Sequence, residues 1–135
     1  MRRSYTSLAV LWLSMTGCSS VQVRQPDGTD AWMSRDEFSA YTEAVFRRYN
    51  RAVDDLIVAG SLDDGEGADA APELLRAEDA MGTACAPLMV AVTAHIEGHA
   101  LGFFERLHMP QAVAACALAT RRVEAVLGAT GAAQP

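Results

Sequence analysis

The chain has 135 residues, of which 17 are acidic and 11 are basic, giving a formal net charge of −6. An acidic chain of this kind repels nucleic acid and anionic lipid headgroups, so neither is expected as a binding partner. Half of the residues are apolar, with alanine supplying many of them, and only 7 % are aromatic; this composition favours helices. The length is sufficient for one domain with a single core.

The N-terminus has the layout of a secretory signal peptide. Arg2 and Arg3 provide a positively charged start, an apolar run occupies residues 8–13, and small residues precede Cys18. Residues 8–15 would span only about 12 Å as a helix, whereas the hydrocarbon core of a bilayer is about 30 Å thick. We therefore expect residues 1–17 to direct export and then to be removed.

Residues 14–18, Ser-Met-Thr-Gly-Cys, resemble a bacterial lipobox, with Met15 at the position where leucine is usual. The resemblance implies a bacterial lipoprotein in which Cys18 carries the lipid and becomes the first residue of the mature chain. Two or three acyl chains hold a protein firmly in a membrane, because each buried methylene contributes about 0.8 kcal/mol. Ser19 follows the cysteine, where lipoproteins of the inner membrane often have aspartate. The resemblance therefore implies the outer membrane, facing the periplasm, rather than the inner membrane.

Residues 18–31 are expected to form the lipidated N-terminus and a flexible tether. The segment 19–30 is rich in turn-forming residues and has no hydrophobic periodicity. Fully extended, it would reach on the order of 40 Å. A helical domain is expected over residues 32–128, followed by a frayed tail at 129–135. Without residues 1–17 the chain carries 9 basic and 17 acidic residues, a formal charge of −8.

A helix over residues 34–59 has the clearest start signal of the chain. Ser34 and Glu37 have the spacing of a capping box, in which each side chain bonds the backbone amide of the other, and Gly60 is a typical stop. One apolar stripe of period 3.6 follows and is expected to be buried: Phe38, Tyr41, Val45, Tyr49, Val53, Leu56 and Ile57. Ion pairs inside the helix are expected between neighbouring charges, namely Arg47, Arg48 and Arg51 with Glu43, Asp54 and Asp55.

The remainder of the domain is expected to contain two or three further helices. An acidic loop precedes a helix that begins at Pro72 and should kink or break at Pro87, where the ring would clash with the preceding turn. Periodicity predicts a helix over residues 88–107, a turn at 107–110 and a last helix from there to Gly128, with Val113, Cys116, Val123 and Leu127 on its buried stripe. No segment after the signal peptide is expected to be long and apolar enough to span a membrane. The fold class is therefore all-α, a small three- to four-helix bundle.

Cys85 and Cys116 remain as a pair once Cys18 is lipidated, and export brings them into a compartment that favours a disulfide. A turn at residues 107–110 between straight helices would leave the two cysteines roughly 24 Å apart along the helix axis. The Cα atoms of a disulfide lie within about 7 Å. The bond therefore requires a bend near residues 98–102 or a steeply crossing last helix, and two buried thiols are the alternative.

His95 and His99 have a spacing that brings two imidazoles to one side of a helix, within reach of one metal ion. The zincin motif is not present, because Glu97 does not directly follow the first histidine. A defined metal site needs three or four ligands, so ordinary histidines at the edge of the core are the preferred interpretation. Asp63 and Asp64 lack the spacing of an EF-hand, and a solvated loop is expected there rather than a calcium site.

The sequence contains no motif for phosphate binding, dinucleotide binding, acyl transfer or haem attachment, so neither an enzymatic activity nor a cofactor is expected. We expect a membrane-anchored envelope lipoprotein that presents a helical domain to a protein partner in the envelope. One alternative is an inhibitor or immunity-type lipoprotein against a cell-wall hydrolase or toxin, because an acidic surface attracts basic enzymes. A metal-binding domain that uses His95 and His99 is another alternative.

Overall fold

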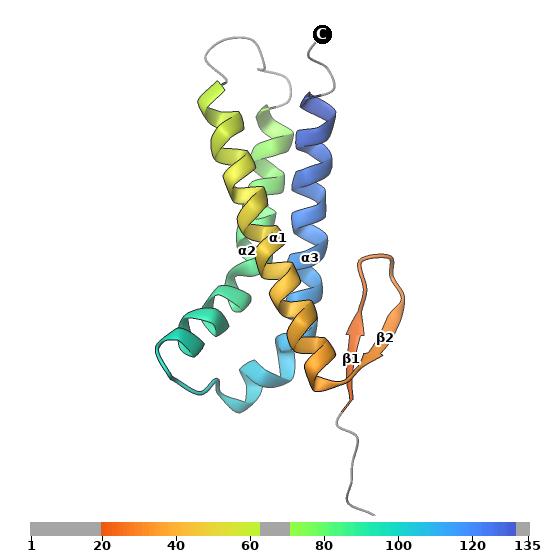
Figure 1. Cartoon of the computed structure of the whole chain (residues 1–135). Coiled ribbons are helices and arrows are strands. Elements are labelled where there is room, and N and C mark those ends of the chain that lie inside the picture. The colour runs from red at the N-terminus through yellow and green to blue at the C-terminus, as the bar shows by residue number, and fades with distance from the viewer. Residues whose placement is uncertain (1–19, 63–70, 132–135) are drawn as a thin grey trace, which may run out of the picture.

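The computed structural model describes residues 20–62 and 71–131. Within these ranges a small sheet of two strands, β1 (Val21–Arg24) and β2 (Asp30–Met33), precedes three long helices, α1 (Arg35–Leu62), α2 (Ala71–Ile96) and α3 (Phe103–Gly131). The helices run alternately up and down along the molecule (Figure 1). The prediction of a mainly helical protein is confirmed, and the sheet is an addition to it. Cys18, Asp63 and Asp64 lie outside the described residues, as do the whole signal peptide and the end of the tail.

β1 and β2 form an antiparallel hairpin where a flexible tether was predicted. The Arg24 Nε donates to the Asp30 Oδ1 across the strands at 3.2 Å. Gly28 adopts a φ of +86° in the turn, a left-handed conformation that costs glycine nothing sterically. Val23 is fully buried, and β1 packs against α3. The tether prediction is therefore wrong for its described part, because the turn formers join two strands and burial of Val23 fastens the hairpin to the helices.

α1 begins with the predicted capping box. The Glu37 amide donates to the Ser34 Oγ at 3.2 Å, and the Ser34 amide donates to the Glu37 Oε2 at 2.7 Å. These bonds lower the pKa of the Glu37 carboxyl below its ordinary value, since they favour the charged form. The helix continues slightly past the predicted end, to Leu62. Its stripe is buried at Val45 and half-buried at most other positions, but Ile57 is 65 % exposed, so the prediction is wrong there.

α2 is one continuous helix across the region where a kink or break was predicted. Pro87 lies in its interior, and the helix changes direction along its length, its lower part swinging away from α1 and α3 (Figure 1). A proline removes one backbone hydrogen bond and crowds the preceding turn, which bends a helix without ending it when the flanking turns are well packed. The predicted kink is thus present and the break is not.

α2 ends in a turn formed by residues 97–102. The Gly98 amide donates to the His95 carbonyl at 3.2 Å, and the His99 amide donates to the Ala94 carbonyl at 2.8 Å. This pair of bonds is a Schellman motif, which requires a left-handed residue at its centre. Gly98 supplies that conformation with a φ of +71°, so the helix stops there.

α3 begins at Phe103, so the predicted helix over residues 88–107 and the predicted turn at 107–110 are both wrong. The Gly102 amide donates to the Glu105 Oε2 at 2.7 Å, which satisfies a backbone donor at the start of the helix. Pro110 was expected to open the last helix, but it lies inside α3. Periodicity missed the true boundary because a strong glycine stop interrupts an apolar pattern that continues on both sides of it.

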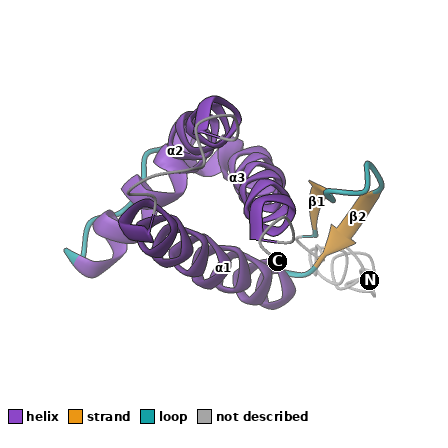
Figure 2. Cartoon of the chain, turned by 90° about the horizontal axis from the view of Figure 1, so that it is seen from above, coloured by secondary structure: helices purple, strands orange, loops and turns teal. Residues whose placement is uncertain are grey.

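α3 is the central helix of the domain. It packs against α2, α1 and β1, whereas α1 and α2 contact each other little. Figure 2 shows the three helices at separate corners, with the hairpin beside α3 on the side away from α2. The buried core draws on all three helices: Val45, Ala52, Ala77, Met81, Cys85, Leu88, Val113, Cys116, Ala117 and Val123. The predicted stripe of the last helix is confirmed, while the faces of α1 and α2 that lie towards each other are left partly uncovered.

Arg48 pairs with α3 rather than within α1. Its Nε donates to the Glu124 Oε1 at 2.6 Å, and a terminal nitrogen bonds the second carboxylate oxygen. These bonds raise the pKa of the Arg48 guanidinium. Arg47 makes the predicted pair within α1, its Nη1 lying 3.5 Å from the Glu43 Oε1, and both of those side chains are exposed.

We expect a double-mutant cycle of Arg48→Met and Glu124→Gln to give a coupling energy of about 1 kcal/mol, because the pair is two-point and half-buried. The control cycle of Arg47→Met and Glu43→Gln should give only about 0.3–0.5 kcal/mol, since that pair is exposed. Urea denaturation at low salt measures both values, and added salt should reduce them. Equal coupling energies would show that the contact between α1 and α3 adds nothing to a surface pair.

Candidate functional site

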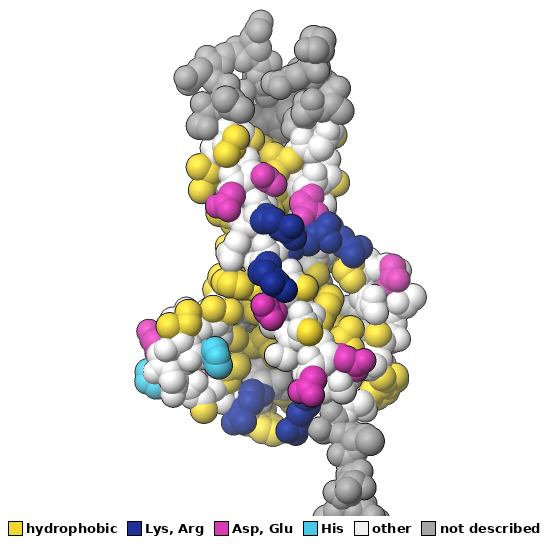
Figure 3. All heavy atoms as spheres, in the orientation of Figure 1, with side chains coloured by type: hydrophobic (Ala, Val, Ile, Leu, Met, Phe, Trp, Pro, Cys, Tyr) yellow, Lys and Arg dark blue, Asp and Glu magenta, His cyan; other side chains and the backbone are white. Residues whose placement is uncertain are grey.

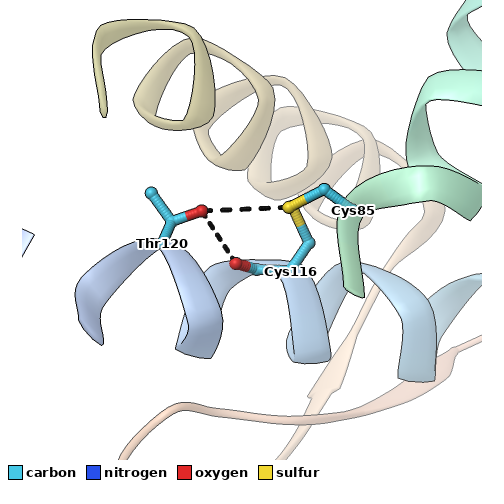
Figure 4. Close-up of a disulfide and its surroundings, with 3 residues drawn as sticks. All are labelled: Cys85, Cys116 and Thr120. Carbon is cyan, nitrogen blue, oxygen red and sulfur yellow. Dashed lines mark hydrogen bonds between the residues drawn. A yellow bond between two sulfur atoms is a disulfide. The ribbon is translucent and has the colours of Figure 1, made fainter. Parts of the chain in front are cut away.

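Cys85 of α2 and Cys116 of α3 form a disulfide, as predicted (Figure 4). Their Cα atoms are 4.5 Å apart and both side chains are fully buried. The Thr120 Oγ1 donates to the Cys116 carbonyl at 2.8 Å and lies 3.9 Å from the Cys85 Sγ. The turn at residues 97–102 lies midway between the two cysteines in the chain, so antiparallel helices bring them opposite each other. The cysteines of the described residues therefore join two helices and supply no thiolate nucleophile.

His95 and His99 do not form the helical pair that the sequence predicted. α2 ends at Ile96, so His99 lies in the following turn, with its Nδ1 3.3 Å from the Glu97 Oε2. Across residues 20–62 and 71–131, no group of three or more histidine, cysteine or acidic side chains is placed to hold a metal ion. The metal-binding interpretation thereby loses the geometry on which it depended.

A groove of about 950 Å³ lies between the upper parts of α1 and α2. It exists because both helices pack against α3 and barely contact one another. Most of its lining is apolar, and its two carboxylates come from α2. The lining residues are Tyr49, Val53, Leu56, Ile57, Gly60, Leu75, Glu78, Asp79, Met81, Gly82 and Thr83. We call this feature the α1–α2 groove.

The α1–α2 groove combines exposed apolar side chains with carboxylates on one wall. Ile57 of α1 and Leu75 of α2 both line it, and each is about two-thirds exposed, at 65 % and 64 %. Glu78 and Asp79 add two carboxylates to the α2 wall. An apolar trough with charges along one wall accommodates an amphipathic helix, whose apolar side chains enter the trough and whose polar side chains meet the wall.

A smaller hollow of about 370 Å³ lies at the turn between α2 and α3. Its lining is mainly apolar and comes from the bent lower part of α2, the turn and the first three turns of α3: Pro87, Val90, Leu101, Phe104, Glu105, His108, Met109 and Ala112. The His108 Nδ1 is 2.8 Å from the Phe104 carbonyl, so the imidazole is engaged with its own helix. The hollow offers apolar contact rather than a set of converging polar groups.

α2 also contains, within Pro72–Ile96, an 18-residue window with a mean hydropathy of 1.2, which by length and composition alone is enough to span a membrane. The expectation that no such segment follows the signal peptide is wrong by this measure. However, α2 supplies Met81 and Leu88 to the core and is covalently joined to α3 through Cys85. α3 carries charged side chains whose transfer into hydrocarbon would be costly. Only 17 % of the 18-residue window is buried, so α2 contributes one face to the core and leaves most of that window exposed.

The sequence did not point to the α1–α2 groove, although it contained a signal for it. Residues 56–58 and 74–75 are runs of consecutive apolar residues, and such runs widen the apolar face of a helix beyond what one neighbouring helix covers. Comparisons of the chain with protein-family models, with curated proteins and with solved structures find no match. The function of the domain is therefore inferred from its geometry.

Proposed function

We propose that the protein is a lipid-anchored envelope protein whose helical domain binds another envelope protein through the α1–α2 groove. Export by residues 1–17 and lipidation of Cys18 would hold the domain at a membrane, with the outer membrane facing the periplasm as the proposed site. The observation that carries the binding role is the apolar trough between two helices that share α3 as their only close helical neighbour within the described residues.

The proposed occupant is an amphipathic helix of the partner that carries arginine or lysine beside its apolar stripe. Its apolar side chains would cover Ile57 and Leu75, the two most exposed apolar residues of the lining. Its basic side chains would meet Glu78 and Asp79, and the acidic balance of the whole chain would favour the encounter. The incoming helix would complete a four-helix bundle, in which the uncovered faces of α1 and α2 pack as the faces on α3 already do.

The test is site-specific photo-crosslinking of the full-length protein in its own cells. A photoreactive residue at position 57 or 75 should form a crosslink to the same protein, and the crosslinked peptide should lie in an amphipathic helix with basic residues. A photoreactive residue at position 118 is the control, because Leu118 on α3 is similarly exposed, at 57 %, but lies outside the groove lining.

The identity of the captured partner separates the two interpretations of the binding role. A partner that is a cell-wall hydrolase or toxin would establish the inhibitor or immunity-type alternative, whereas a structural or assembly protein of the envelope would establish the first. Equal crosslinking from all three positions would overturn the groove as the binding site.

A further inference from the structure

Several large apolar side chains are exposed together at the turn between α2 and α3. Ile96, Phe103, Phe104 and Leu107 have between 60 and 78 % of their surface exposed. The rings of Phe103 and Phe104 stack edge to face with centroids 5.5 Å apart, so the two aromatic side chains form one surface feature. We call residues 96–107 the apolar elbow.

The apolar elbow lies at the same end of the molecule as the start of β1. In Figure 1 the turn between α2 and α3, the start of α1 and the first residue of β1 all lie at the lower end, and the end of α3 lies at the upper end. Val21 opens β1 and is separated from Cys18 by two residues. The chain between them can therefore extend at most about 11 Å, because the hairpin takes up the length that was expected to be a tether.

We propose that the apolar elbow inserts into the lipid interface of the membrane in which Cys18 is anchored; this rests on the lipid anchor of the proposed function. A lipid at Cys18 would hold the lower end of the domain against the bilayer surface, and the elbow is the exposed apolar feature at that end. Aromatic and aliphatic side chains of an interfacial helix bury themselves at the boundary between headgroups and acyl chains. With the lower end so held, the α1–α2 groove, which lies in the upper half, would face away from the membrane.

Insertion of the elbow would depend on apolar burial and not on attraction to anionic headgroups. Figure 3 shows arginine and acidic side chains together at the lower end of the molecule. The elbow contains Arg106 together with Glu97 and Glu105, so its acidic and basic side chains carry a formal net charge of −1. This charge gives the elbow no attraction to anionic headgroups, so its contact with the membrane would rest on burial of the apolar side chains.

The test places a tryptophan in the elbow of the mature, lipidated protein, which lacks Trp12 because residues 1–17 have been removed. Trp32 is replaced by phenylalanine to remove the tryptophan of β2, and Phe104→Trp is introduced as the probe, with Phe103→Trp as a second probe. The protein is reconstituted into phosphatidylcholine vesicles with or without lipids brominated along the acyl chains. Leu75→Trp is the matched control, because Leu75 is also largely exposed, at 64 %, and lies near the start of α2, at the opposite end of the molecule (Figure 1).

We expect brominated lipid to quench the emission of Trp at position 104 or 103 at least twofold and to leave that of Trp at position 75 nearly unchanged. Mass spectrometry of the same preparation reports whether Cys18 carries lipid. A lipidated protein in which elbow and control tryptophans are quenched equally would overturn the insertion of the elbow and leave the anchor in place. A preparation without lipid on Cys18 would overturn the anchor and the inference together.

Discussion

Replacement of Cys85 and Cys116 by alanine is expected to lower the free energy of unfolding by about 3–4 kcal/mol. The bond closes a segment with a sequence separation of 31 residues, and loss of such a cross-link restores the corresponding loop entropy to the unfolded chain. Both side chains are fully buried, so alanine keeps the site apolar and leaves no unpaired polar group. The effect is large because the bond joins α2 to the central helix in the middle of the core.

Urea denaturation of the purified mature protein measures this loss. The wild-type protein should lose a similar free energy when it is reduced in urea and refolded under reducing conditions, whereas the double alanine variant should be insensitive to the reductant. A wild-type midpoint that does not change on reduction would contradict the stabilising role of the disulfide.

Leu88→Ala is expected to destabilise the domain by about 2–5 kcal/mol. Leu88 is 1 % exposed and is the largest of the fully buried side chains, so its truncation removes apolar burial and leaves a cavity. The site has little freedom to collapse, because Leu88 lies one turn from Cys85, which is bonded to α3. For the same reason, the effects of Leu88→Ala and of the cysteine variant should not be additive.

Leu118→Ala is the matched control for this substitution. The same side chain is removed, but Leu118 is 57 % exposed on α3, and a surface truncation of this kind costs at most about 0.5 kcal/mol. Thermal and urea denaturation of the two variants provide the comparison. Similar midpoints for Leu88→Ala and Leu118→Ala would mean that the described core does not carry the stability of the domain.

Local features of the helices followed the sequence closely. The capping box of Ser34 and Glu37 forms as predicted, because its two hydrogen bonds join residues within one helical turn. The stripe that contains Val113, Cys116 and Val123 is buried as predicted, since helical periodicity alone brings these residues to one face. The groove could not be predicted in this way. It depends on the distance between α1 and α2, and the spacing of residues within either helix does not determine that distance.

The disulfide could be predicted from the sequence only in part. Composition and compartment indicated that Cys85 and Cys116 would pair, and the geometric requirement of a bend near residues 98–102 was also evident from the sequence. The expected turn at 107–110 was wrong, because two signals competed: proline at position 110 suggested a helix start, while Gly98 could adopt the left-handed conformation that ends α2. In the structure Gly98 prevails, and the Schellman bonds at that glycine end α2 there.

By itself, the sequence determined the export signal and candidate lipid attachment site as predictions, the helical class, the start of α1 and the pairing of two cysteines. These features depend on composition or on contacts between residues close in the chain. Only the tertiary structure decided that residues 21–33 dock as a hairpin, that Arg48 bonds Glu124, and that α1 and α2 leave a groove between them. Each of these depends on the relative placement of separate elements, which packing around α3 sets and local sequence does not encode. Burial of Val23 against the helices likewise turns a segment that was expected to be a tether into a fixed strand.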